Sequence, residues 1–278
     1  MYGAIEAGGT KFICAYGNSP TDIHVSTAIP TTTPKETLRL VAEFFQGKKL
    51  KRAGIACFGP LEIGKGRISP LTPKLEWRGF KIQSEVEKAL GCPAVLDTDV
   101  NGAALGEHLW GAAQKSKHFV YVTVGTGIGG GAIINGQLVH GLLHPEIGHM
   151  RVRRFGGDEF FGNCPVHGDC LEGLAAGPAI AERWGVERAE LLPEHHPAWA
   201  MEAHYLGQMA VNLACAYSPE ILILGGGISL RKGMINMVKQ SAEQEMNGYA
   251  PLPTIVRAKL GARAGVLGAL ALAKRQKI

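Results

Sequence analysis

The pattern that most constrains the fold of this chain is a strand, a Gly-Thr turn and a second strand, and it occurs twice. The first copy turns at Gly8-Gly9-Thr10, and the second begins near Phe119 and turns at Gly125-Thr126-Gly127. Short apolar and β-branched runs bounded by glycine are typical of strands. Helical patterns follow the strands in each half. The repeat therefore predicts an α/β protein built from two related halves.

Local signals predict the elements that follow each turn. Thr33-Pro34-Lys35-Glu36 has the cap, the proline and the acidic residue expected at a helix start. A polar run, Asp97-Thr98-Asp99-Val100-Asn101, lies between a short strand and a helix. Further strands are expected at 55–58, 94–96, 119–124, 132–134 and 221–224, and further helices near 171–184, 200–217 and 230–246 and from about 263.

Composition narrows the class of protein. The chain has 278 residues, of which 46% are hydrophobic and 19% charged, so it is globular and long enough for two modest domains. A net charge of +5 suits an anionic small-molecule ligand. The sequence lacks the dense Lys/Arg stripe that is typical of nucleic-acid-binding proteins. No apolar run approaches the roughly 20 residues of a membrane span. No secretory signal is visible, and four scattered cysteines without framework spacing indicate reduced thiols in the cytoplasm.

A cluster of potential metal ligands, which we call the metal box, follows the second turn. It runs from Glu146 through His149 to Cys164-x2-His167-x2-Cys170 and ends at Glu172. Two imidazoles and two thiolates are the ligands that tetrahedral zinc prefers. Four protein ligands leave no position for water or substrate, so His149, Cys164, His167 and Cys170 predict a structural Zn²⁺. His144 is the one plausible substitute ligand, and His140, His195 and His196 are expected in solvated loops without matching partners.

The glycine-rich turns allow two interpretations. Gly125-x-Gly127-x-x-Gly130 formally matches a dinucleotide-binding fingerprint, but that fingerprint requires a helix after the glycines. Here a β-branched segment and an Asn135-Gly136 turn follow, which predicts a hairpin. A single such turn is simply a tight hairpin. Two matched turns, whose N–H groups and Thr hydroxyls can bind an anion, could grip a triphosphate from two sides.

These segments together resemble one known family. Residues 6–11 and 124–131 look like the two phosphate motifs of the sugar-kinase, heat-shock-protein-70 and actin superfamily, and residues 224–229 look like its adenosine motif. The metal box narrows the resemblance to the ROK family of repressors, open reading frames and kinases. Residues 72–77 and 97–107 are similar to its fructokinase branch. The resemblance spans nearly the whole chain.

The resemblance implies an α/β fold of two RNase H-like, actin-like ATPase lobes around a central cleft, with the structural zinc site. The small lobe would hold residues 1–110 and the C-terminal helix 263–278, and the large lobe residues 111–262. It also implies ATP with Mg²⁺, a cytoplasmic location and a homodimer. The implied ATP- and phosphate-binding residues are Gly8, Gly9, Thr10, Lys11, Gly125, Thr126, Gly127, Gly225, Gly226 and Gly227.

Two positions depart from the family pattern. Relatives usually carry Asp at position 6, where it is linked to the Mg²⁺ of Mg-ATP, and Glu6 is one methylene longer. Glucokinase-like members carry Asn at position 98, where it touches a sugar hydroxyl. Thr98 has no amide to donate, which argues against simple glucose specificity.

Phosphoryl transfer to a sugar needs a carboxylate that takes the hydroxyl proton. Asp99, between a strand and a helix, is the catalytic candidate, and the alternative is that it only caps a helix beginning near Asn101. Asp97 is expected to be structural. The expected sugar-binding residues are Asn101, Glu146, His149 and Glu172, because paired hydrogen bonds from vicinal hydroxyls to carboxylates are strong. Lys74 and Trp77 are further candidates, although packing alone would explain Trp77.

The expected function is therefore transfer of the γ-phosphoryl group of ATP to the 6-hydroxyl of fructose, with glucose or mannose as the alternative hexose. A ROK transcriptional regulator carries a helix-turn-helix segment before the first phosphate motif. That motif begins here at Glu6, which leaves no room for such a segment. A zinc-containing dinucleotide oxidoreductase is disfavoured by the predicted hairpin after Gly131. ATP and a hexose are the expected partners, with neither nucleic acid nor membrane.

Overall fold

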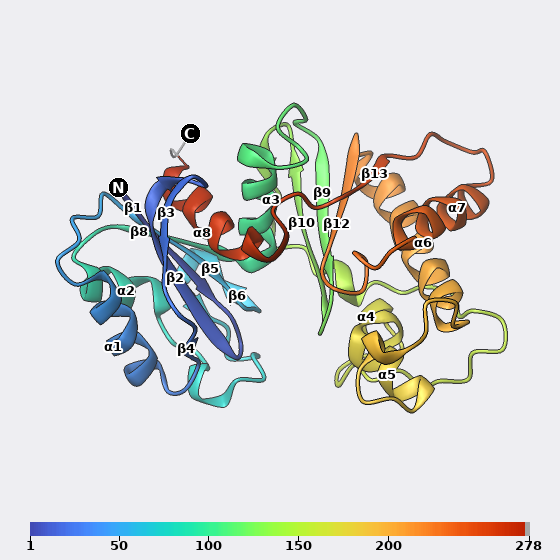
Figure 1. The fold of residues 1–278 in the computed structure, drawn as a ribbon, viewed down its shortest axis with the longest axis horizontal. Helices are drawn as coiled ribbons and strands as arrows, with labels where there is room; N and C mark the ends of the chain where they lie inside the picture. Colours follow the sequence, from blue (N-terminus) through green and yellow to red (C-terminus); the bar gives the residue numbers. More distant parts are fainter. Residues whose placement is uncertain (276–278) are drawn as a thin grey trace. The chain divides into compact units, whose positions relative to one another are not determined.

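The computed structural model describes residues 1–275, which form two compact units (Figure 1). The first unit comprises Met1–Gln114, His140–His144 and the chain from Leu260 onward, and the second comprises Lys115–Val139 and Pro145–Lys259. The sequence had indicated a continuous stretch from 111 to 262 for the large lobe, but His140–His144 lies in the first unit. Residues 276–278 of the predicted C-terminal helix lie outside the described residues.

The first unit contains a mixed sheet. Its strands run in the order β3-β2-β1-β5-β8, with β4 paired to β2. The β1–β2 pair is antiparallel, whereas β1–β5 and β5–β8 are parallel. Its elements are β1 (Tyr2–Ala7), β2 (Lys11–Ser19), β3 (Asp22–Val25), β4 (Ile29–Pro30), α1 (Pro34–Phe45), β5 (Ala53–Cys57), β6 (Leu61–Glu62), β7 (Arg67–Ile68), α2 (Ile82–Leu90), β8 (Ala94–Thr98), α3 (Asp99–Trp110) and α8 (Ala264–Lys274), with short 3-10 turns η1 (Ile63–Lys65), η2 (Leu75–Trp77) and η5 (Gly261–Arg263).

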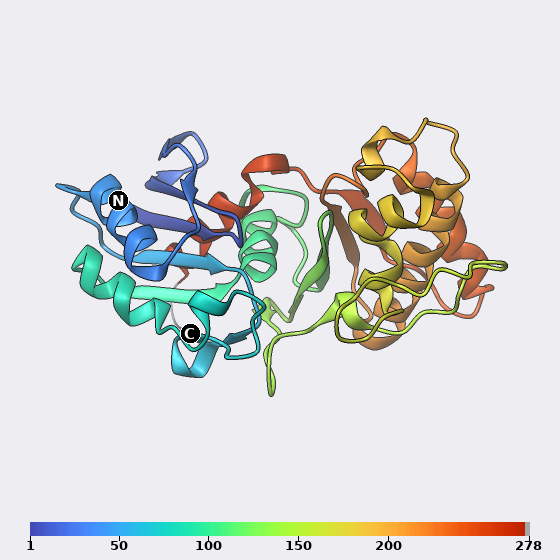
Figure 2. The ribbon, with the colours of Figure 1, turned by 90° about the horizontal axis from the view of Figure 1, so that it is seen from below.

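Helices cover both faces of this sheet, as Figures 1 and 2 show. Ile5 and Ile55 point to one face and pack in a single buried cluster with Leu38 of α1 and Val86 of α2. The intervening residues point to the other face, where Gly54 meets the backbone of α8. Because successive side chains of a strand alternate between faces, these buried runs serve two helical layers.

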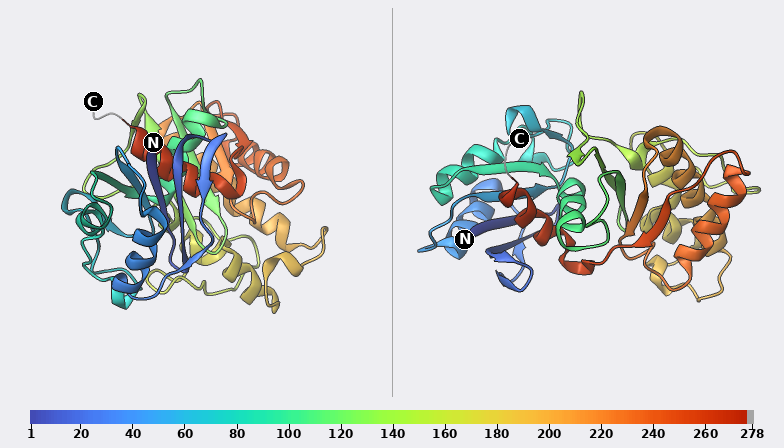
Figure 3. Two further views of the ribbon diagram at one scale, coloured as in Figure 1. Left: turned by 60° about the vertical axis from the view of Figure 1, so that its left-hand side comes forward. Right: turned by 90° about the horizontal axis from the view of Figure 1, so that it is seen from above.

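The second unit also contains a mixed sheet, with its helices packed against one buried cluster (Figure 3). The strand order is β11-β10-β9-β12-β13. Its elements are β9 (Phe119–Val124), β10 (Ile128–Ile134), β11 (Gln137–Leu138), η3 (Ile147–His149), α4 (Leu171–Ala175), α5 (Gly177–Trp184), η4 (Ala189–Leu191), α6 (Ala198–Tyr217), β12 (Ile221–Gly225), α7 (Met234–Met246) and β13 (Thr254–Arg257).

The two sheets repeat one topology. In each sheet the central strand is β1 or β9. On one side it pairs antiparallel with the next strand along the chain (β2 or β10), which pairs antiparallel with β3 or β11. On the other side it pairs parallel with β5 or β12, which pairs parallel with β8 or β13. Three short strands of the first unit, β4, β6 and β7, have no counterpart in this scheme. The repeat expected from the two Gly-Thr turns is confirmed at the level of strand order. Within residues 1–275, none of the helices combines the length and apolarity needed to cross a bilayer.

Some predicted boundaries were wrong. The strand after the second turn begins at Ile128 and not at Ala132, so the glycines from 129 to 131 lie within it. The single helix expected over 171–184 is two helices that are separated at Ala176, which has extended backbone angles. Pro178 has no N–H to donate to a preceding turn, and the Gly177 N–H bonds instead to Gly125 O at 2.7 Å.

Gly54 provides a test of the packing between β5 and α8. A Cβ at this position would lie 1.9 Å from Ala269 O, a backbone atom that a side-chain rotation cannot move. We expect Gly54→Ala to lower the free energy of unfolding by about 3 kcal/mol, because overpacking forces the helix off the sheet. Gly64→Ala is the matched control, since a Cβ there meets no atom within 4 Å. Urea denaturation followed by circular dichroism measures both, and equal midpoints would contradict the packing.

Candidate functional site

In the first unit, three parallel strands end side by side and carry the candidate catalytic groups. Ala7, Cys57 and Thr98 are partners across β1, β5 and β8. The Gly8-Gly9-Thr10 turn follows the first of these strands and Asp99 follows the third. Ligands of α/β sheets bind beyond the carboxyl ends of such strands. The register therefore places a glycine-rich turn and an exposed carboxylate at one sheet edge.

The Gly8-Gly9-Thr10 turn is fixed by hydrogen bonds from outside it. The Gly8 N–H donates to Lys11 O at 3.0 Å. Thr31 bonds the turn twice: its N–H donates to Thr10 O at 3.0 Å and its hydroxyl donates to Gly8 O at 2.8 Å. The turn is thus held from its carbonyl side, which is the arrangement needed to present N–H groups to an anion.

Asp99 is the first residue of α3, and the cap of that helix is Thr98. The Thr98 hydroxyl accepts the Asn101 N–H at 3.1 Å, and the Asp99 carboxylate accepts the Val100 N–H at 2.9 Å. Thr98 is buried and Asp99 is exposed. The helix therefore begins two residues earlier than expected, and Asp99 is not the N-cap, although its carboxylate lies at the helix N-terminus.

Glu6 lies beside Asp99 at the same sheet edge. Burial is the main cause that raises the pKa of Glu6, and the negative charge of Asp99 adds to it. Lys11 and a hydrogen bond from the Val266 amide of α8 oppose this shift. Glu6 is longer than the Asp that relatives usually carry, and a glycine of α8 leaves space for it. A Cβ on Gly265 would lie 2.2 Å from the Glu6 carboxyl carbon. A cation bound near these two carboxyl groups would favour their charged forms.

Asp97, Asn101 and His140 form a hydrogen-bonded group under the start of α3. The Asn101 amide donates to Asp97 Oδ1 at 2.7 Å and lies 3.3 Å from His140 Nε2. The same His140 nitrogen lies 3.1 Å from Asp97 Oδ2. His140 is an exposed loop residue, as predicted, but the prediction that it has no matching partner was wrong. Asn101 is 0% exposed; its amide nitrogen supports Asp97, and its buried Oδ1 has no hydrogen-bond partner among the described residues.

In the second unit, two glycine-rich segments meet at the ends of adjacent parallel strands. Gly225 of β12 pairs with Thr123 of β9, and the Ile228 N–H donates to Val124 O at 3.1 Å. Gly226 has φ of 85° and a Cβ there would lie 2.2 Å from Val124 O, so both its conformation and its contacts require glycine. The predicted second phosphate motif and adenosine motif are therefore neighbours.

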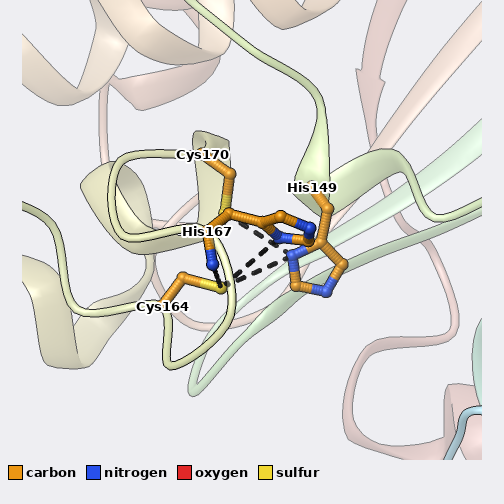
Figure 4. A group of neighbouring side chains, drawn as sticks. All are labelled: His149, Cys164, His167 and Cys170. Carbon is orange, nitrogen blue, oxygen red and sulfur yellow. Dashed lines mark hydrogen bonds between the residues drawn. The ribbon is translucent and has the colours of Figure 1, made fainter.

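The four predicted metal ligands converge in the second unit (Figure 4). Their ligand atoms all lie within 4.8 Å of one another. His149 Nδ1 lies 3.5 Å from Cys170 Sγ and 3.7 Å from Cys164 Sγ, and His167 Nδ1 lies 3.8 Å from Cys164 Sγ. Zinc–nitrogen and zinc–sulfur bonds in a tetrahedron separate such atoms by about 3.6 Å. The donor set and its spacing fit one metal ion.

His144, the substitute ligand considered from the sequence, is not part of this group. It lies in the first unit beside Gly59, whose added Cβ would be 3.6 Å from His144 Nε2. Ion pairs hold the loop that carries the other candidate ligands, since Asp169 forms an ion pair with Arg151 and lies 3.2 Å from Arg154. Burial raises the pKa of the Cys170 thiol to about 11, and a bound cation opposes this by favouring the thiolate.

Glu172 joins the metal box to the second Gly-Thr turn. It lies in the first turn of α4, two residues after Cys170, and its Oε2 accepts the Ile128 N–H at 2.8 Å. A Cβ on Gly127 would lie 2.7 Å from the same oxygen. Glu146 is exposed immediately before η3, which carries His149. The predicted sugar-binding residues of the second unit therefore surround the metal ligands.

Comparison with known proteins agrees with these features. A model of the ROK family matches residues 2–276. The fructokinase of Zymomonas mobilis is 42% identical over 98% of this chain and 96% of its own, and that of Pediococcus pentosaceus is 39% identical over 99% and 98%. Among solved structures, a ROK hexokinase from Thermus thermophilus superposes with a TM-score of 0.82 at 29% identity, over 98% of this chain and 97% of that one. The chain belongs to the ROK family.

Proposed function

We propose that this protein is an ATP-dependent fructokinase that transfers the γ-phosphoryl group of ATP to the 6-hydroxyl of fructose. One observation carries the proposal of phosphoryl transfer. The Gly8-Gly9-Thr10 turn follows β1 and the exposed Asp99 carboxylate follows β8, so both lie at the carboxyl ends of the parallel strands β1, β5 and β8. The two fructokinases described above support fructose as the sugar.

Asp99 acts in this proposal as the general base. Its carboxylate accepts the proton of the 6-hydroxyl as that oxygen attacks the γ-phosphorus and the bond from phosphorus to the β-γ bridging oxygen breaks. The buried Asp97 and Asn101, together with the exposed His140, hold the start of α3 beneath it. Asn101 is therefore assigned to positioning and is withdrawn from the sugar-binding set. Thr98 is occupied as the helix cap, which disfavours a glucokinase-like contact at this position.

The nucleotide would use the glycine-rich turns of each unit. Residues 8–11 and 125–127 are proposed to bind its phosphates, and residues 225–227 its adenosine portion. Glu6 would hold the Mg²⁺ that accompanies ATP, and its electrostatic coupling to Asp99 supports this role. When bound, Mg²⁺ neutralises the phosphate oxygens.

The sugar is proposed to contact Glu146, His149 and Glu172 in the second unit. The proposal of Zn²⁺ is supported by two sulfurs and two nitrogens that lie within 4.8 Å of one another, the donor set that tetrahedral zinc prefers. Zinc would fix the loop and orient the His149 ring through Nδ1, which leaves Nε2 to face a hydroxyl. The family resemblance also supports a homodimer, which light scattering after size exclusion measures directly.

Purified protein should release ADP when fructose and Mg-ATP are both present, and should form fructose 6-phosphate. A panel of fructose, glucose, mannose and an amino sugar, each with and without Mg²⁺, measures the preference as kcat/KM. We expect kcat/KM for fructose to exceed that for glucose by at least tenfold. A site that forms hydrogen bonds with the hydroxyls of one sugar leaves some of its polar groups without partners when another sugar binds. A preference for glucose or mannose would show that fructose is not the main substrate. A lack of activity on every sugar would reject the proposal that the protein is a sugar kinase.

A further inference from the structure

We propose that Lys74 binds the phosphoryl group that is transferred, as a cation placed over the first phosphate turn. The inference rests on the proposed kinase function and adds a residue to its catalytic machinery. A Cβ on Gly9 would lie 3.3 Å from Lys74 Cε. The ammonium, one bond beyond that carbon, therefore lies close to the turn whose N–H groups are proposed to bind phosphate.

The position of Lys74 is fixed from the protein interior. Trp77, three residues later, is 1% exposed, and its indole N–H donates to Thr32 O at 2.8 Å. Thr72, two residues earlier, is fully buried and accepts the Lys74 N–H at 3.4 Å. Lys74 is thus an exposed residue between two buried anchors, and its backbone is held while its side chain remains accessible.

The same short segment holds both the turn and the Lys74 loop. Thr31 bonds Gly8 O and Thr10 O, and the next residue, Thr32, bonds the Trp77 indole. Two consecutive residues therefore set the distance between the turn and Lys74. A chance approach of a surface lysine would not require a buried tryptophan hydrogen-bonded to the segment that also braces the turn.

The charges around the turn distinguish Lys74 from Lys11. Lys11 acts on Glu6, because its charge lowers the pKa of that carboxyl. Within residues 1–275 the structure shows no ion pair of Lys74 with Asp or Glu. An unpaired ammonium over an anion-binding turn is arranged to neutralise an oxygen of the γ-phosphoryl group, whose charge is spread over three oxygens during transfer. Lys74 is by this argument a catalytic residue.

Lys74→Met keeps the length of the side chain and removes its charge. We expect kcat for fructose to fall about 10- to 100-fold, as for loss of one charge-assisted hydrogen bond to the transition state. Lys74→Arg should recover part of the loss. Lys49→Met, an exposed lysine in the loop before β5, is the matched control and should leave kcat unchanged. A change of kcat smaller than twofold in Lys74→Met would overturn the proposal.

Nucleotide binding separates this role from structural damage and from the proposed function itself. By calorimetry with Mg²⁺ and no sugar, Lys74→Met should bind AMPPNP about tenfold more weakly and ADP unchanged, since only AMPPNP carries a γ-phosphoryl group. Equal weakening of both nucleotides, or a higher KM for fructose with kcat and AMPPNP affinity unchanged, would overturn it. If the wild type phosphorylates no sugar, the kinase proposal fails while the difference between the nucleotides still tests Lys74.

Discussion

Replacement of Asp99 by Asn is expected to lower kcat for fructose phosphorylation by about a thousandfold while Mg-ATP still binds. The amide has the shape of the carboxylate but cannot take the hydroxyl proton, and a positioned general base contributes roughly 10²–10⁴-fold. Steady-state ADP release and calorimetry of AMPPNP measure the two quantities. The fold should survive, because the cap of α3 is the Thr98 hydroxyl and not the substituted side chain.

The matched control for this substitution is Asp22→Asn, an exposed aspartate on β3 that bonds only its own hairpin. It should retain the kcat of the wild type. Circular dichroism and the unfolding midpoint of the Asp99 variant check that the loss is chemical. A variant that keeps more than a tenth of the wild-type kcat would remove Asp99 from the role of base.

The second large effect is expected from the metal box. Wild-type protein should contain about one zinc per chain, and Cys170→Ser should lose it. We expect the substitution to lower stability by about 4 kcal/mol and the melting temperature by about 10 °C, because a lost metal is among the largest single causes of destabilisation. Elemental analysis and thermal unfolding measure these changes. Cys215→Ser, an exposed thiol near the end of α6, is the control and should retain both zinc and stability.

Loss of zinc should weaken sugar binding more than nucleotide binding. Glu172 follows Cys170 by two residues and His149 is itself a ligand, so both lose their support when the metal leaves. We expect KM for fructose to rise at least tenfold in the zinc-free protein. AMPPNP affinity should fall by a smaller factor, because Glu172 also contacts the second Gly-Thr turn. Fully active protein with a zinc content near zero would show that the four residues hold no functional metal.

Much of this site follows from local sequence. Cys164, His167 and Cys170 are within seven residues, so their spacing alone places three ligands on one loop, and a single well-placed histidine completes the set. The two Gly-Thr turns were recognisable because each lies between strand patterns. The hairpin expected after Gly131 was found, since β10 pairs antiparallel with β11 across the Asn135-Gly136 turn, and the family that these segments resemble was confirmed.

Other features had no local signal. His140 reaches Asp97 from 43 residues away, and Lys74 reaches Gly9 through a tryptophan bonded to a segment 45 residues earlier. The division of the predicted helix at Ala176 did have a local signal in Gly177-Pro178, but the bond from the Gly177 N–H to Gly125 O had none. Such contacts require knowledge of which strands are neighbours and in which register.

The amino-acid sequence by itself determined most of the elements, the glycine-rich turns, the candidate metal ligands and the family, because these depend on residue type and on spacings of a few residues. The tertiary structure alone decided that Thr98 and not Asp99 caps α3, that Asn101 is buried, and that Lys74 lies beside Gly9 of the first Gly-Thr turn. The physical reason is that the burial of Asn101 and the place of Lys74 depend on contacts between residues far apart in the sequence, which periodicity does not encode. The cap of α3 is a local bond, but Thr98 and Asp99 are both suitable cap residues, so only the backbone conformation decides between them.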